Sequence, residues 1–169
     1  MTILYLVRHG ETVDNANHIM QGQVQGELNK TGIQQAEELS QRLREEPIDV
    51  FVASDLKRSI DTCRILAAPH GKEVTTTPLL RERDWGSFTG KYIPDLQNAV
   101  WPDDVEPLDV LLSRARSFLK YIRESFPDQR VLAVGHGIVN KAIQAVFLNK
   151  TMKDVERMTN CEVRVLELK

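Results

Sequence analysis

The stretch TILYLVRHGET, residues 2–12, opens with a continuous run of apolar and β-branched residues, Thr2–Val7, that stops at Arg8-His9-Gly10. A short continuous apolar run of this kind is typical of a strand that is buried on both faces of a sheet. In open α/β sheets, ligands bind beyond the carboxyl ends of the strands. The stretch therefore predicts a buried strand that delivers an arginine and a histidine to a binding site.

Strand-like and helix-like stretches alternate through the rest of the chain. Strands are expected at residues 48–53, 74–77 and 130–134, with a candidate edge strand at 163–166. Apolar residues at helical spacing predict four helices. The first opens at Thr31 with Gln34 as its capping-box partner, and the second opens at the possible caps Ser54 and Asp55. The other two cover about 108–122 and 138–148, and residues 92–107 are expected to be irregular. This alternation predicts a three-layer α/β/α fold around a mostly parallel sheet.

Composition limits the classes of protein that are possible. The 169 residues fit a single domain, with 85–107 as a short cap segment. Lys and Arg total 22 and Asp and Glu total 24, a net charge of −2, which argues against a nucleic-acid or membrane surface. Cys63 and Cys161 match no zinc spacing, and no apolar run reaches about 18 residues. We expect a cytoplasmic domain, and the sequence does not indicate its oligomeric state.

Three expected strand ends carry related chemistry. Besides Arg8 and His9, Arg58 follows the second strand by one helical turn, and His136 follows the fourth between two glycines. Two arginines balance the two negative charges of a phosphate, and a neutral imidazole is a nucleophile near pH 7. Glu82, or else Asp84, could donate the proton to a leaving oxygen. If the strand ends adjoin, these residues form a site for phosphoryl transfer.

Five blocks of the sequence, in order, together resemble the histidine phosphatase superfamily, whose fold is called phosphoglycerate mutase-like. The blocks are Arg8-His9-Gly10-Glu11-Thr12-x-x-Asn15; Gln21-Gly22-Gln23 with Leu28, Gly32 and Gln35-Ala36; Ser54-Asp55-Leu56-x-Arg58-x-x-x-Thr62; Leu80-x-Glu82-x-x-x-Gly86-x-x-x-Gly90; and Gly135-His136-Gly137.

The resemblance implies a role for each matching residue. His9 would become phosphohistidine, Arg8, Arg58 and His136 would complete the phosphate pocket, and Glu82 would act as the acid. Positions that line the pocket in the family are occupied here by Asn15, Gln21, Gly22 and Gly137. Neither a metal nor a cofactor is implied, because the arginines neutralise the phosphate charge. The implied partner is a small phosphomonoester.

The family contains phosphatases and mutases, and this sequence favours a phosphatase. About sixteen residues separate Gly90 from the helix that starts near Pro107, whereas the mutases are usually longer and close over a bisphosphorylated cofactor. A small-molecule phosphomonoesterase resembling the alpha-ribazole phosphatase branch is therefore our first hypothesis. The alternatives are a phosphoglycerate mutase-type transfer and a catalytically silent phosphate-binding module.

Some residues also have a purely structural interpretation. The charged string 81–84 could be a solvated loop, and Asn15 and Gln21 could be turn residues without a ligand contact. His18 and His70 read as surface or loop residues. Trp85 and Trp101 are interpreted as aromatic residues of the core packing or of the pocket rim.

Overall fold

A five-stranded sheet lies at the centre of the computed structural model, which describes residues 1–169, and its strand order is β3-β2-β4-β1-β5. The strands are β1 Thr2–Arg8, β2 Val50–Ser54, β3 Val74–Thr77, β4 Arg130–Gly135 and β5 Val163–Leu168. The first four strands are parallel, through the pairs β1–β4, β4–β2 and β2–β3. β5 lies at the edge of the sheet and is antiparallel to β1. The predictions of a mostly parallel sheet and of an edge strand are confirmed.

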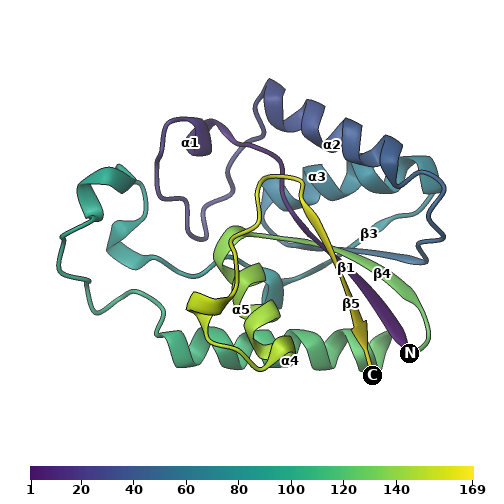
Figure 1. Cartoon of the computed structure of the whole chain (residues 1–169). Helices are drawn as coiled ribbons and strands as arrows, with labels where there is room; N and C mark the ends of the chain where they lie inside the picture. Colours follow the sequence, from purple (N-terminus) through teal and green to yellow (C-terminus); the bar gives the residue numbers. More distant parts are fainter.

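The helices form two layers on the sheet. They are α1 Val13–Ala16, α2 Lys30–Arg42, α3 Lys57–Ala67, α4 Leu108–Ser125 and α5 Gly137–Leu148. α2 and α3 cover one face, and α4 and α5 cover the other (Figure 1). The predicted α/β/α layering is therefore confirmed. None of these helices is long and apolar enough to span a membrane.

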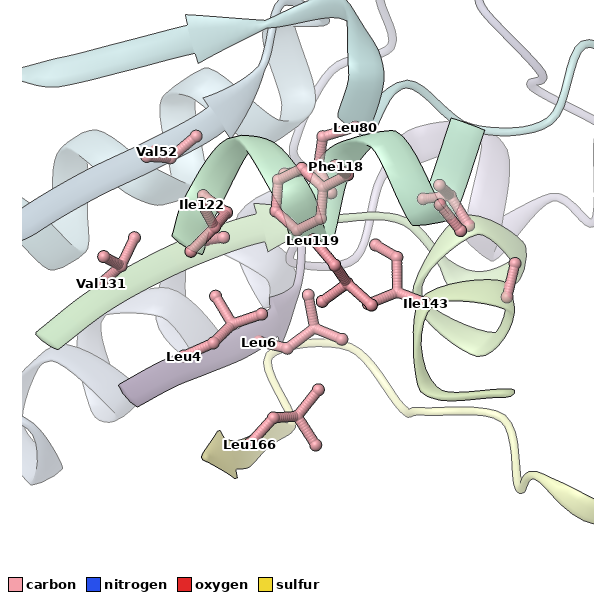
Figure 2. Close-up of a cluster of buried hydrophobic side chains, with 14 of the residues drawn as sticks. Leu4, Leu6, Val52, Leu80, Phe118, Leu119, Ile122, Val131, Ile143 and Leu166 are labelled. Carbon is pink, nitrogen blue, oxygen red and sulfur yellow. The ribbon is translucent and has the colours of Figure 1, made fainter. Parts of the chain in front are cut away.

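Alternation along the central strands explains the two cores. In β1, Leu4 and Leu6 join the core against α4 and α5, while Tyr5 and Val7 join the core against α2 and α3. Successive strand residues point to opposite faces, so a strand covered on both sides is apolar throughout. Figure 2 shows Leu4 and Leu6 beneath side chains of α4 and α5. Each such leucine contributes about 2 kcal/mol by burial.

Two predicted helix starts are wrong. α2 begins at Lys30, because the Asn29 side chain, and not Thr31, accepts the Gly32 N–H at 2.8 Å. Its predicted capping partner Gln34 donates instead to Glu38 one turn later, at 3.1 Å. A cap is decided by where the preceding loop places an acceptor, and Asn is as good a cap as Thr.

α3 begins at Lys57 without a side-chain cap, so the predicted caps Ser54 and Asp55 are also wrong. Asp55 is bonded through both carboxylate oxygens to Arg81, at 2.6 and 2.7 Å. The Ser54 hydroxyl contacts His136. A tertiary partner therefore holds Asp55, while the Ser54 hydroxyl also accepts from the Leu56 N–H at 3.4 Å, a contact that precedes the first turn of α3.

The segment 81–107 extends beyond the carboxyl ends of the strands, where it is coloured teal in Figure 1. It contains only two 3₁₀ turns, Gly86–Phe88 and Ile93–Leu96, as expected of an irregular stretch. Its backbone is joined to the loop after α1: the Met20 N–H donates to Lys91 at 2.9 Å, and the Ile93 N–H donates to His18 at 2.8 Å. That residues 85–107 cap the site remains a prediction.

Candidate active site

The strand order brings the chemistry-bearing strand ends together. β4 lies between β1 and β2, and Arg8 is in register with Gly135. The rings of His9 and His136, which directly follow β1 and β4, have centroids 5.1 Å apart. A cavity of ≈ 230 Å³ opens at this point. Among the predicted site residues, it is lined by Arg8, His9, Gln21, Gly22, Arg58, Glu82 and Gly137.

His9 is buried and presents one ring nitrogen to the cavity. Its Nδ1 lies 2.7 Å from the carbonyl oxygen of Gly10. Because a carbonyl only accepts, Nδ1 carries the proton and Nε2 keeps its lone pair. Burial, followed by the charges of Arg58 and Arg8, holds the pKa of His9 well below its usual value. The ring is therefore neutral at pH 7 and has a free nucleophilic nitrogen.

Arg8 and Arg58 supply buried positive charge on the cavity wall. Arg8 donates from Nη1 to the Met158 carbonyl at 2.8 Å, and Arg58 donates from Nη2 to the Gly22 carbonyl at 2.7 Å. Burial is the main reason that the pKa of each falls to about 10, which leaves both charged at neutral pH. The Nε atom of each is buried without a partner. Both arginines therefore retain donors for a bound anion.

Glu82 is held by the first turn of α5. Its Oε2 accepts from the Ile138 N–H at 3.0 Å, and its Oε1 accepts from Val139 at 2.9 Å and from Arg83 at 2.8 Å. The first N–H groups of a helix have no partner within the helix, so a carboxylate satisfies them well. The carboxyl is thus fixed in orientation on the cavity wall. Asp84 does not line this cavity and accepts from Gly86 instead, at 2.9 Å.

His136 is fully buried beside His9 and, unlike His9, does not line the cavity, so its predicted contact with the phosphate stays a prediction. Its Nε2 lies 2.7 Å from the Ser54 hydroxyl and 3.0 Å from the Ser59 hydroxyl, whereas its Nδ1 has no partner. Burial and the nearby charge of Arg58 lower the pKa of its ring well below the usual value. The second histidine is therefore also neutral, and two serines fix its orientation.

The two remaining residues that are predicted to contact substrate, Gln21 and Asn15, lie in different hollows. Gln21 lines the cavity while its Oε1 accepts from the Thr12 hydroxyl at 3.0 Å. Asn15 does not line it: its Oδ1 accepts from the Thr12 N–H at 3.1 Å and closes the capping box of α1. Asn15 instead borders an adjoining hollow of ≈ 410 Å³. Its predicted contact with substrate stays a prediction.

Sequence reasoning missed Arg157, which lines both the cavity and the adjoining hollow. It lies in the irregular stretch between α5 and β5, where neither periodicity nor a motif marks it. Apolar side chains form the rest of the cavity wall, namely Ile19, Met20, Trp85, Ile93 and Ile138. The interpretation of Trp85 as a packing and rim residue fits its ring contact with Trp101, at 5.4 Å between centroids.

This site combines neutral buried histidines, buried arginines and a carboxyl group at the carboxyl ends of the strands of an α/β sheet. Such a combination is typical of α/β proteins that bind or transfer phosphoryl groups. The sequence model described as Histidine phosphatase superfamily (branch 1) matches residues 4–169, and the chain belongs to this family. No cluster of three or more His, Cys, Asp or Glu side chains that could hold a metal ion is present.

Known relatives cover nearly the whole chain. It is 35% identical over 182 residues to Phosphoglycerate mutase-like protein 4 of Arabidopsis thaliana, covering 98% of this chain and 79% of the relative. It is 34% identical over 188 residues to the Metal-independent phosphoserine phosphatase of the same plant, covering 100% and 77%. Among solved structures, Bacillus stearothermophilus YhfR superposes with a TM-score of 0.92 at 26% identity, covering 99% of this chain and 91% of that one.

Proposed function

We propose that the chain is a metal-independent phosphomonoesterase that hydrolyses a small phosphorylated metabolite through a phosphohistidine intermediate. The observation that carries this proposal is the free Nε2 of a neutral His9 on the wall of a cavity shared with Arg8, Arg58 and Glu82. The name of the Arabidopsis phosphoserine phosphatase, which matches the whole of this chain over 77% of its own length, supports the same activity.

The first half-reaction transfers the phosphoryl group to His9. Nε2 forms a bond to phosphorus while the ester oxygen leaves and takes a proton from the Glu82 carboxyl. Arg8 and Arg58 stabilise the charge on the three phosphoryl oxygens, which is the main demand of such a transition state. The Gly10 carbonyl, hydrogen-bonded to Nδ1–H, stabilises the positive charge that develops on the ring.

The second half-reaction releases phosphate. Glu82, now a carboxylate, takes a proton from water, whose oxygen forms a bond to phosphorus as the phosphorus–nitrogen bond breaks. His9 and Glu82 thereby return to their starting states. Arg8 and Arg58 supply the positive charge that a metal ion provides in many other phosphatases.

The experiment is phosphate release from p-nitrophenyl phosphate in EDTA near pH 6, with His9→Ala and the remote His70→Ala in parallel. We expect turnover in the wild type and in His70→Ala, and a loss of at least about 10³-fold in His9→Ala. Comparable activity in His9→Ala would disprove the intermediate. If the wild type were inactive, activity on phosphoglycerate stimulated by a bisphosphorylated cofactor would support a mutase, and phosphate binding without turnover would support a silent module.

A further inference from the structure

The Arg114 side chain of α4 contacts the loop that carries the candidate acid. Its Nη1 donates to the carbonyl oxygens of Leu79, at 3.1 Å, and of Arg81. Its Nη2 donates to the carbonyl oxygen of Glu82 at 3.4 Å. One largely buried side chain, 16% exposed, therefore holds the backbone that leads to Glu82 at three points.

Glu106, two residues before α4, locks this guanidinium and binds the loop on the other side of Glu82. Its Oε1 accepts from Nη2 of Arg114 at 2.8 Å, and its Oε2 accepts from Nε at 3.1 Å. Oε1 also accepts from the Asp84 N–H at 3.0 Å, and the Glu106 N–H donates to the Asp84 carbonyl at 2.8 Å. The Glu106 carbonyl accepts from Nε of Arg83 at 2.8 Å. Every N–H donor of Arg114 thus has an acceptor, and the ion pair holds the loop both before and after Glu82.

The loop depends on such contacts because it has no regular secondary structure. Residues 81–85 belong to no helix or strand, so neither a helical nor a sheet pattern of hydrogen bonds fixes their backbone. The Glu82 carboxyl is fixed separately, by the N–H groups of Ile138 and Val139 in α5. The candidate acid is therefore held between two helices: α4 determines where its backbone lies, and α5 determines where its carboxyl points.

We propose that Arg114, locked by Glu106, is the positioning residue of the acid and keeps the Glu82 carboxyl within reach of the leaving ester oxygen. Arg114 does not line the cavity, so it acts through Glu82 and not on the substrate. Proton transfer needs heavy atoms about 2.6–3.2 Å apart, and a displacement of about 1 Å costs on the order of 10²-fold in rate. This assignment rests on the proposed phosphatase function and adds a residue to its machinery.

A guanidinium is required because its planar fork reaches the three carbonyls and the carboxylate at once. The ammonium of a lysine is a single point with three donors, so it cannot reproduce that set of contacts. Arg114→Lys therefore keeps a positive charge beside the buried Glu106 carboxylate while it releases the loop. Glu106→Gln is the second variant: it keeps the size of the side chain and removes the charge that locks the guanidinium.

The test compares two esters of similar shape, p-nitrophenyl phosphate and phenyl phosphate. Phenolate is the poorer leaving group, so only phenyl phosphate depends strongly on the acid. The kcat values are measured in Arg114→Lys and Glu106→Gln, each alone and combined with Glu82→Gln. The matched control is Arg130→Lys: this arginine is half-buried and donates to the Tyr5 hydroxyl at 2.6 Å, at the amino end of β4 and away from the cavity.

We expect Arg114→Lys to lower kcat by about 10- to 100-fold for phenyl phosphate and by less than about threefold for p-nitrophenyl phosphate. Glu106→Gln should act in the same direction, and Arg130→Lys should not separate the two esters. In the Glu82→Gln background, Arg114→Lys should lower phenyl phosphate turnover by less than about threefold, because no acid is left to position. An arginine that only stabilises the fold would not produce this dependence on Glu82.

Equal losses on both esters in Arg114→Lys, or a full further loss in the Glu82→Gln background, overturn the positioning role, while turnover of p-nitrophenyl phosphate by the wild type leaves the phosphatase function standing. If Arg114→Lys does not fold, the same two comparisons on Glu106→Gln decide the question. Absence of hydrolysis of both esters by the wild type overturns both proposals.

Discussion

The carboxylate of Glu82 and the backbone N–H of Val139 lie 2.9 Å apart, which joins the loop of the candidate acid to the first turn of α5. The same turn follows His136 directly. The candidate acid and the second histidine are therefore positioned by a single structural element. A small shift at the start of α5 would move both groups together.

Glu82→Gln should lower kcat far more for esters with poor leaving groups than for esters with good ones. Glycerol 3-phosphate has a poor leaving group and should lose about 10²- to 10⁴-fold in kcat, whereas p-nitrophenyl phosphate, which needs little protonation, should lose far less. Steady-state kinetics with both esters measure the difference. Asp84→Asn, a change in the same loop but outside the cavity, is the matched control and should show no such separation. Equal losses on both esters in Glu82→Gln would argue against an acid role.

The free energy of unfolding should fall as the pH drops below about 6.5. Burial lowers the pKa of His9 and His136 well below 6.5, so below that pH the unfolded chain binds more protons than the native protein. The expected slope is up to about 1.4 kcal/mol per pH unit for each histidine. Urea unfolding between pH 7 and pH 5 measures it, and His9→Asn should reduce the slope. Stability that stays level or rises on acidification would contradict the burial of neutral rings.

The fold was predictable because its central strands are apolar throughout. β1 and β4 lie within one residue of their expected bounds, since strands covered on both faces leave little ambiguity in the pattern. The edge strand β3 also matches its expected bounds, because its residues, one valine and three threonines, are all β-branched. Helix starts were less predictable. Asn29 caps α2 and Asp55 binds Arg81, choices that depend on where loops and distant side chains lie.

The site was predictable where residues follow strand ends and unpredictable elsewhere. His9 and His136 adjoin because β1 and β4 pair, and Arg58 follows from the start of α3. Arg157 belongs to an irregular segment whose path is set by packing rather than by a local pattern. No spacing in the sequence relates that segment to the cavity.

Substitutions of the two serines around His136 should have non-additive effects on the free energy of unfolding. Ser54→Ala and Ser59→Ala each leave one hydroxyl at Nε2, so each should cost about 1 kcal/mol, while the double variant leaves a buried nitrogen unsatisfied. We expect its cost to exceed the sum of the single costs by about 1 kcal/mol. Urea unfolding provides the measurement, with the exposed Ser117→Ala as control within about 0.5 kcal/mol. Strict additivity would show that the two hydroxyls do not share Nε2 as a hydrogen-bond partner.

Gly32→Ala should disrupt both stability and activity. A Cβ at this position of α2 would lie 2.0 Å from the carbonyl oxygen of Glu11, a backbone atom two residues after His9. The clash can be relieved only by moving α2 and the loop that positions His9 apart, at a cost of about 3 kcal/mol or more. Gly71→Ala is the matched control: its Cβ would meet nothing within 4 Å, so only the strain of its left-handed conformation remains, about 1 kcal/mol. Urea unfolding together with p-nitrophenyl phosphate turnover tests both variants. Equal stability of the two, with full activity in Gly32→Ala, would mean that α2 does not fix the position of the His9 loop.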